Sequence, residues 1–505
     1  MKKLLLLSAF CSAAPLLAAP APSAKTPAAS AKNPIASVKT PAASAKTPAA
    51  SAKKPVVAPK SIDRASKTVA KPAIASSSGV TKREMLPNGV QFITRPDKLA
   101  PIAAISLVIR AGAAEENPSN AGWRRFLVGA MLRGTPQGFG NEAGVGLTEA
   151  APGEGLPRVA EKLGGQIGAT VGDDFIEIYV VGRSDRAPEL LDLALSLWQK
   201  PRLSAEDLSA ARESSQNQID ADNLDTASKT QAALRSQLFR DARGELSAYG
   251  LPDYGTSQSL ASLTDDKLRA LYASKVAGAR VTVAATGDFD AAALRQKLAT
   301  LPARMASEPA TPFFAAPKSA SALVVRELPI PSAWVFISYP LAGDTKADAP
   351  ALRVLASALG DSGVARLPAR LLKNQPMGAP PVANSVAAQF IPRRYAGELV
   401  VFAQTGPQNV ERVKNALLDE IRKLRDAPLP QSELQSARTY ARGSWSLERQ
   451  NARERAFQTA LSPALGGALD ASFPARLERV TSAQVQAAAK KYLKSYAVAL
   501  VMPGE

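Results

Sequence analysis

The stretch Gly122-Trp-Arg-Arg-Phe-Leu-Val-Gly-Ala-Met-Leu-Arg-Gly-Thr135 decides the fold of this 505-residue chain. Its large apolar residues recur at the spacing of one helical face, namely at Trp123, Phe126, Leu127, Ala130 and Met131. Gly134 is a typical residue to end such a helix. An apolar run at residues 102–110 and a polar loop at 117–120 precede it. We therefore expect a strand, a loop and an amphipathic helix in this order.

The order of elements around this helix resembles that of the pitrilysin/insulinase-type zinc metallopeptidases, the inverzincins, a family that includes the mitochondrial processing peptidase. In that family the helix carries the motif H-x-x-E-H, and here the same frame reads Arg125, Val128 and Gly129. The family's third zinc ligand is a glutamate on a later helix, and the run 208–219 places Gln218 at that position. The resemblance identifies a member in which all four working positions are changed.

Changes at these positions remove the chemistry of a hydrolytic zinc site. Such a site needs about three N, O or S ligands, and a carboxylate must take a proton from the bound water. Arg125 is a permanent cation, Val128 has no basic atom and Gly129 has no side chain, while Gln218 is a weak neutral ligand. We expect no metal, no catalytic residue and no hydrolytic activity of the chain on its own.

The amino-acid composition argues against other classes of enzyme. The chain contains no histidine, and its only cysteine is Cys11, so it has no Ser-His pair and no thiol outside the first residues. It also lacks a Gly-rich phosphate loop with its lysine, so we expect no cofactor. The neighbouring acids Glu115-Glu116 and Asp173-Asp174 are interpreted as loop charges rather than a catalytic dyad.

The first 79 residues predict two segments without a fold of their own. Residues 1–22 have a basic start, an apolar middle and small residues at the end, which is typical of a secretory signal peptide. Lipid attachment at Cys11 would need a small residue before it, and Phe10 is not small, so we expect cleavage and export, for example to the periplasm. Residues 23–79 repeat Lys, Pro, Ala and Ser about every seven residues, which predicts a disordered linker.

Charge is concentrated in that linker. Residues 20–83 hold twelve Lys or Arg against one Asp, whereas the whole chain has a formal net charge of +18. Because the body that follows is nearly neutral, we expect no nucleic-acid binding. The linker is interpreted either as a contact with an anionic envelope surface or as a plain solubilising spacer.

Two α+β halves follow, at residues 80–310 and 321–505. The segments 263–287 and 480–504 align without a gap at an offset of 217 residues, with Thr264 matching Thr481 and Gly287 matching Gly504. This pattern predicts a duplicated fold, and the resemblance implies two peptidase-like α/β sandwich halves arranged as a clamshell. Within them we expect a Gly-rich insertion at 136–152, a helical region at 205–239 interrupted near 223–225, and a helix at 410–425 capped by Asn409.

The resemblance also points to places for a peptide. Family members add the peptide as a strand to a sheet edge in the first half, and the matching residues here are Gln166, Ile167, Gly168, Ala169 and Thr170. The alternative is an ordinary inner strand. In two-chain members the inactive subunit often grips the substrate with an arginine and a tyrosine from its second half. The reshaped stretch 364–385 offers Arg366 and Arg370 but no tyrosine, and we favour the simpler interpretation that both arginines belong to the polar face of a helix.

Two functions are compatible with these expectations. The first is an exported non-catalytic subunit that forms a heterodimer with an active zinc-bearing homologue and acts on peptides or unfolded proteins. The second is a stand-alone peptide-binding or scaffold protein of the envelope, tethered by its basic linker. We prefer the first, because a half-clamshell without chemistry gains a function most simply through a partner that has it.

Overall fold

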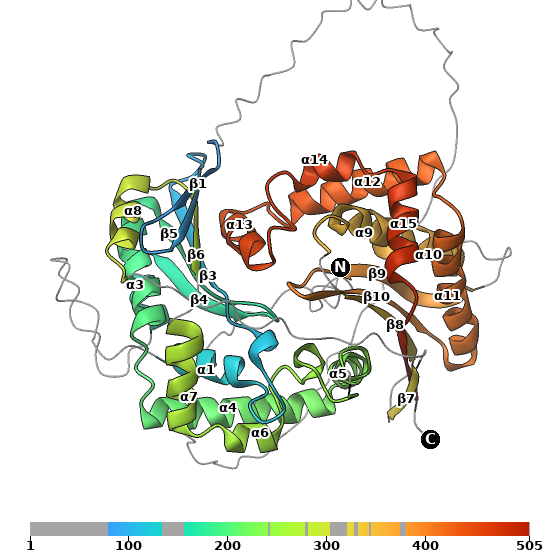
Figure 1. Ribbon diagram of the computed structural model, residues 1–505, viewed down its shortest axis with the longest axis horizontal. Coiled ribbons are helices and arrows are strands. Elements are labelled where there is room, and N and C mark those ends of the chain that lie inside the picture. The colour runs from blue at the N-terminus through green and yellow to red at the C-terminus, as the bar shows by residue number, and fades with distance from the viewer. Residues whose placement is uncertain are drawn as a thin grey trace, which may run out of the picture. The chain divides into compact units, whose positions relative to one another are not determined.

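The computed structural model describes residues 79–133, 156–240, 243–277, 281–302, 321–327, 332–342, 345–373 and 380–503 (Figure 1). The predictions for residues 1–78 and for the insertion at 136–152 lie outside the described residues. So does the connection between the two halves, at residues 303–320. The predicted class is confirmed, because the described chain forms two halves that each combine one sheet with several helices.

The first half is built on a six-stranded sheet in the order β1-β2-β6-β3-β5-β4. Strand β6 runs parallel to β2 and antiparallel to β3. The turn between β1 and β2 contains Asn88, whose Nδ2 donates to the carbonyls of Leu298 and Leu301 at 2.7 and 3.1 Å. The strands are β1 (Lys82–Met85), β2 (Gln91–Pro96), β3 (Ile102–Ile109), β4 (Gly165–Val171), β5 (Ile176–Arg183) and β6 (Val281–Gly287).

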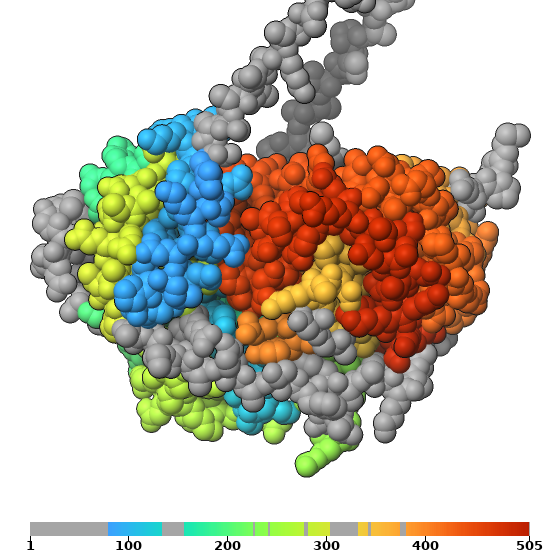
Figure 2. Space-filling view, turned by 45° about the horizontal axis from the view of Figure 1, so that its top comes forward, coloured from blue at the N-terminus to red at the C-terminus, as the bar shows by residue number. Residues whose placement is uncertain are grey.

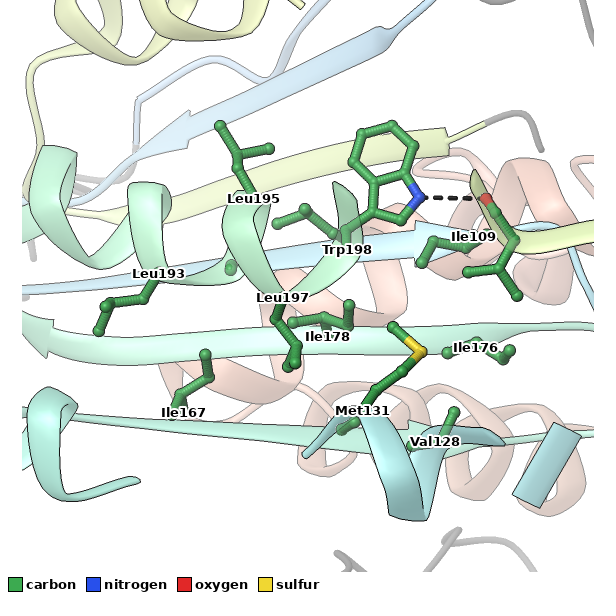
Figure 3. Packing of buried hydrophobic residues seen from close by; sticks show 14 of the residues in the cluster. Ile109, Val128, Met131, Ile167, Ile176, Ile178, Leu193, Leu195, Leu197 and Trp198 are labelled. Atoms are coloured by element: carbon green, nitrogen blue, oxygen red, sulfur yellow. Dashed lines mark hydrogen bonds between the residues drawn. The ribbon is translucent and has the colours of Figure 1, made fainter. Parts of the chain in front are cut away.

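Helices cover one face of this sheet. Figure 3 shows Leu197 of α3 beside Ile178 of β5, and the Trp198 Nε1 donates to the carbonyl of Val276 at 3.1 Å. The helical region expected at 205–239 is two helices that meet at Asp225. The helices of this half are α1 (Trp123–Met131), α2 (Leu156–Lys162), α3 (Ala187–Gln199), α4 (Ala205–Leu224), α5 (Thr226–Leu238), α6 (Ser257–Ser262), α7 (Asp265–Leu271) and α8 (Ala291–Ala299).

The second half has a five-stranded sheet in the order β7-β11-β8-β10-β9. Its strands are β7 (Ser321–Glu327), β8 (Ala333–Ala342), β9 (Ala383–Ile391), β10 (Ala396–Thr405) and β11 (Ala497–Pro503). Its helices are α9 (Ala349–Ala356), α10 (Arg366–Pro368), α11 (Val410–Asp426), α12 (Gln431–Leu447), α13 (Ala452–Ala464), α14 (Phe473–Glu478) and α15 (Ser482–Tyr492). Short π-helical turns at Ser357–Asp361 and Ala369–Lys373 extend α9 and α10.

The predicted duplication is confirmed in topology and in detail. Strand β11 runs parallel to β7 and antiparallel to β8, as β6 does between β2 and β3. Thr264 and Thr481 each cap the helix before this strand, because their hydroxyls accept the backbone N–H of Lys267 and Gln484. The offset of 217 residues therefore joins structurally equivalent caps.

Two local predictions for the second half need correction. Asn409 occupies the N-cap position of α11, as predicted, but its side chain makes no capping hydrogen bond. The stretch 364–385, expected to be a reshaped loop, contains α10 and a π-helical turn, and its last residues begin β9. Strand β9 escapes the sequence pattern because alanine and glutamine, which are poor strand formers, occupy its centre.

Each half also covers the second face of the other half's sheet. Helix α13 of the second half packs on β3 and β6 of the first (Figure 1), where its apolar side meets Ile93, Val108 and Ala284. The Thr286 hydroxyl of β6 donates to the carbonyl of Ala452, at the start of α13, at 2.6 Å. Sheet residues buried on both faces explain why β3 is apolar almost throughout rather than half-exposed.

Helix α5 makes the reciprocal contact. Leu234 and Leu238 of α5 lie in one apolar cluster with side chains from β8, β10 and β11 of the second sheet. The buried sheet residues of that cluster are Phe336, Ala387, Ala396, Val400, Phe402, Ala497, Ala499 and Val501. In each half one helix, α5 after α4 and α13 after α12, packs on the sheet of the other half. The two halves thus exchange equivalent helices.

This exchange predicts that the α13 contact is needed for the stability of the whole molecule. Ala460 of α13 is fully buried against the first sheet, so Ala460→Glu places an unpaired carboxylate there. We expect a loss of about 3 kcal/mol or more in the free energy of unfolding, measured by urea denaturation. Ala475→Glu on the exposed side of α14 is the matched control, with an expected change of about 0.5 kcal/mol or less. Equal effects of the two substitutions would contradict the exchange.

Candidate functional site

Helix α1 carries the changed motif frame. Gly122 before it has φ +83°, and a Cβ there would lie 2.2 Å from the carbonyl oxygen of Tyr254. Only glycine therefore allows the start of α1 to approach residues 253–255 so closely. The close contact brings Asp253 and Tyr254 to the arginines at the start of α1.

The three motif positions have separate surroundings. Arg125 is 12 % exposed, forms an ion pair with Asp253 at 3.0 Å and lies over the ring of Tyr254. Val128 is buried in the apolar core, and Figure 3 shows it beside Met131 and near Ile176. At Gly129 a Cβ would meet only the Ala211 Cβ of α4, at 3.9 Å.

Gln218 lies on α4, the helix that packs against α1. Its Nε2 donates to the carboxylate of Asp222 at 2.8 Å. Burial raises the pKa of Asp222, and the hydrogen bond from Gln218 lowers it. The charge of Asp253 raises this pKa as well, whereas the charge of Arg125 lowers it. The four changed positions therefore lie on two packed helices, α1 and α4, and the Gln218 amide is hydrogen-bonded to a carboxylate.

A second arginine beside the frame is fully buried. The Nη1 of Arg124 lies 2.6 Å from the carboxylate of Glu116, and its Nη2 donates to Asp253 at 2.8 Å. Burial alone would lower the pKa of Arg124, but Glu116, Asp253 and Asp173 raise it above its usual value. Burial raises the pKa of Glu116, although Arg124 opposes this. Arg124 is therefore held as a cation by its carboxylates.

The network continues into the second half. Arg235 of α5 donates to Asp173 at 3.1 Å and to Asp253 at 3.3 Å. Arg393, from the turn between β9 and β10, binds Asp173 and pairs with Glu398 at 2.9 Å. Burial would raise the pKa of Asp173, but Arg235 and Arg393 hold it at about 2. One carboxylate of the first half is thus shared by arginines of both halves.

Asp174 also links the halves. It accepts hydrogen bonds from the hydroxyl of Tyr249 and, at 2.9 Å, from the backbone N–H of Arg394. Burial raises the pKa of Asp174 to about 6, against the effect of these hydrogen bonds.

The two acidic pairs lie in connections, before α1 and between β4 and β5, as interpreted, but they are largely buried rather than solvated. Glu116 and Asp174 are buried, and Asp173 is four-fifths buried. A signal was present in the sequence, because charged doublets stand close to apolar runs in both halves: Arg124-Arg125, Asp173-Asp174 and Arg393-Arg394. Their mutual pairing could not be read from spacing alone.

Strand β4, the predicted peptide edge, lies at the end of the first sheet and pairs only with β5 among the described strands. The alternative of an inner strand is therefore wrong. Ile167 and Ala169 face the core, Gln166 is exposed and Gly168 lies against the ring of Tyr179. Thr170 donates to the buried Glu177 at 2.6 Å, and Arg453 of α13 reaches the same carboxylate at 2.7 Å. Binding of a peptide at this edge stays a prediction.

Arg366 and Arg370 lie apart from the motif frame, within the second half. Arg366 pairs with Glu433 at 2.7 Å, and Arg370 pairs with Asp419 and Glu420 at 2.6 and 2.7 Å. The Arg366 pair borders a cavity of about 280 Å³ between the turn at Ser357–Asp361 and α12. Both arginines join neighbouring helices, which agrees with the simpler interpretation of a polar helix face.

The donor set at the frame does not fit zinc. Its four positions hold an arginine, a valine, a glycine and a glutamine, and none of these supplies an imidazole or a thiolate. The arginines also add fixed positive charge, which repels a metal cation. Across the described residues, no group of three or more Asp, Glu, His or Cys could hold a metal ion.

Within the described part of the chain, no helix is long and apolar enough to cross a membrane.

Comparison with known proteins agrees with this description. The model of the insulinase family, peptidase family M16, matches residues 91–250, and the model of the M16 inactive domain matches residues 262–440. Together the two matches cover well over half of the chain. The chain belongs to peptidase family M16. No curated protein matches the sequence of this M16 chain.

Solved structures share the fold at low sequence identity. A protease from Helicobacter pylori has a TM-score of 0.71 and 14 % identity, covering 84 % of this chain and 99 % of its own. An M16 inactive-domain protein from Pseudomonas fluorescens has a TM-score of 0.70 and 18 % identity, covering 84 % and 98 %. A chain of complex III2 from Candida albicans has a TM-score of 0.64 and 18 % identity, covering 83 % and 95 %.

The buried carboxylate of Asp174 predicts an unusual pH dependence. Its pKa is about 6 in the folded chain against an ordinary value of 3.8, so its protonation favours folding. Relative to Asp174→Asn, wild type should lose up to about 3 kcal/mol of unfolding free energy as the pH rises from about 4 to about 7.5. Urea denaturation of both proteins at several pH values measures this. A difference that stays constant over this range would show that the carboxylate is not buried as described.

Restoring the motif should not restore the site. In Arg125→His/Val128→Glu/Gly129→His the new carboxylate enters the apolar core at position 128, and Asp253 loses one of its arginines. A Cβ fits at position 129, so the obstacle is electrostatic rather than steric. We expect weak zinc binding by isothermal titration and no hydrolysis of a fluorogenic peptide.

The quadruple variant that adds Gln218→Glu is the companion test. An anionic third ligand should raise zinc affinity more than activity. Robust hydrolysis by the triple variant alone would mean that the role of Gln218 is misassigned.

Proposed function

We propose that this M16 chain is a non-catalytic homologue that acts through an active, zinc-bearing partner in the degradation or processing of peptides or unfolded proteins. The observation that supports this most is the buried network at the motif frame. Arg125 stands in the frame that corresponds to the family's zinc motif and Arg124 lies beside it, and two carboxylates of the first half, Glu116 and Asp253, compensate them. The frame is therefore a built structural centre rather than a site that has merely lost one ligand.

A partner subunit is the second part of the proposal. Two-chain members of the family combine one subunit that keeps the zinc site with one that lacks it. The fold is shared with a chain of complex III2, which is a multi-subunit assembly. Strand β4, which pairs only with β5 among the described strands, is the edge to which an extended peptide delivered between such subunits would add. We further propose export, from the signal-like sequence of residues 1–22.

The stand-alone alternative rests on the same edge strand. A chain that binds peptides along β4 without a partner would need only main-chain hydrogen bonds at that edge. It is the weaker candidate, because a chain without catalytic residues gains a function most simply through a partner that has them.

Co-expression with a zinc-bearing M16 homologue from the same genome tests the proposal. The isolated chain should hold no stoichiometric zinc and cleave no peptide. The two chains should co-purify in a fixed ratio, and the pair should hydrolyse peptides several-fold faster than the homologue alone. The measurements are metal analysis, size-exclusion chromatography and a fluorogenic assay.

The control assigns the chemistry. Replacing the glutamate of the homologue's H-x-x-E-H by glutamine should abolish hydrolysis without separating the chains. A monodisperse monomer beside a homologue that is fully active alone would refute the partnership. Hydrolysis by the isolated chain would refute the non-catalytic role.

A further inference from the structure

The cavity beside Arg366 has no part in the function proposed above. It has a volume of about 280 Å³ and lies between the π-helical turn at Ser357–Asp361, α10 and α12. All its lining residues belong to the second half, so it is separate from the motif frame and from β4. Figure 2 shows the yellow segment at α9, which leads into this turn, between red and orange helices of the same half.

The π-helical turn gives the cavity its shape. Gly360 in this turn lies close to β9, since a Cβ there would be 2.7 Å from the backbone nitrogen of Ala388. The glycine therefore lets the turn sit directly on the sheet. Single π-helical turns are rare and are frequent at functional sites. Here two of them, Ser357–Asp361 and Ala369–Lys373, contribute to the lining of one cavity.

Serine hydroxyls supply much of the polarity of the cavity. The lining contains Ser357, Ser362, Ser432 and Ser436. Ser357 is fully buried, yet its hydroxyl makes no hydrogen bond of normal geometry. Burial raises the pKa of the neighbouring Asp361, and a weak contact with Ser357 lowers it. The Ser357 hydroxyl is therefore a buried polar group with capacity left to bind a ligand.

One wall of the cavity holds both signs of charge. The Arg366 Nε donates to the Glu433 carboxylate at 2.7 Å, which leaves the other guanidinium N–H groups and the second carboxylate oxygen for a ligand. The two side chains are 18 % and 40 % exposed. A partly exposed pair adds little stability, so a ligand can share both groups at small cost.

The rest of the lining limits the size and shape of a ligand. It consists of alanines and of Val364, which is 74 % exposed at the opening. None of the described residues that line the cavity is aromatic. A sugar ring or a nucleobase therefore finds no stacking surface. A simple anion is disfavoured as well, because the Glu433 carboxylate stands beside Arg366.

We propose that this cavity binds a small zwitterion, namely a free α-amino acid or a dipeptide with short side chains. Arg366 binds the carboxylate of the ligand, and Glu433 accepts hydrogen bonds from its ammonium group. The serine hydroxyls bind its remaining polar atoms, and the alanines contact its short side chains. The proposal goes beyond the proposed function and does not depend on it.

The first test uses four probes that differ only in charge or length. L-alanine and L-alanyl-L-alanine are titrated into the full chain by isothermal calorimetry, with saturation-transfer NMR to detect weak binding. N-acetyl-L-alanine lacks the ammonium group, and L-alaninamide lacks the carboxylate. Both zwitterions should bind, and each single-charge analogue should bind about ten-fold more weakly than L-alanine.

The second test places the zwitterion in the cavity. Arg366→Gln should weaken the binding of L-alanine about ten-fold, and Ser357→Ala about five-fold. Arg295→Gln is the matched control, because it breaks an exposed ion pair with Glu84 in the first half, and it should leave binding unchanged. Thermal unfolding of each variant checks that it folds.

Three outcomes overturn the proposal: neither zwitterion binds, the single-charge analogues bind as well as L-alanine, or Arg366→Gln leaves binding unchanged. If Arg366→Gln does not fold, Glu433→Gln takes its place. This variant should weaken the binding of L-alanine and leave that of N-acetyl-L-alanine unchanged, because only the ammonium group loses its acceptor. Unchanged binding of L-alanine to Glu433→Gln would equally overturn the proposal.

Discussion

A single carboxylate, Asp253, lies among three guanidinium groups, those of Arg124, Arg125 and Arg235. Without it, three cations would face one another in a largely buried region, since the side chains of Arg124 and Arg235 are 1 % and 8 % exposed. Its pKa is far below the usual range, because the arginines outweigh the cost of burial. Buried ion pairs of this kind add little net stability compared with apolar side chains, but loss of one partner is severe. The arrangement of α1 against residues 253–255 depends on this compensation.

Stability comes from elsewhere, from the apolar faces that the halves exchange. Helices α5 and α13 each complete the core of the opposite half. These contacts lack direction and tolerate sliding, whereas the pairs from Asp173 to Arg235 and Arg393 are directional. We infer that apolar burial holds the halves together and the charged network fixes their register.

Much of this fold could be read from the sequence, for identifiable reasons. The face at Trp123 to Met131 is a local periodic signal, and the repeat of Thr264 at Thr481 is a linear one. The buried ion-pair network gives neither a periodic nor a linear signal, since Asp173 and Arg393 are 220 residues apart and meet only through tertiary packing. The motif frame could be placed from the family resemblance, but its replacement by an ion-pair centre could not. Strand β9 was missed because its centre lacks β-branched residues.

The exchange of helices has a consequence for biosynthesis. The first sheet has all its strands once β6 ends at Gly287, but the helix that covers its second face starts only at Ala452. At about 5–20 residues per second, roughly ten to thirty seconds of translation separate the two events. During that interval Ile93, Val108 and Ala284 present an uncovered apolar surface. The nascent chain therefore exposes this apolar surface to aggregation until α13, which ends at Ala464 of 505 residues, has been made.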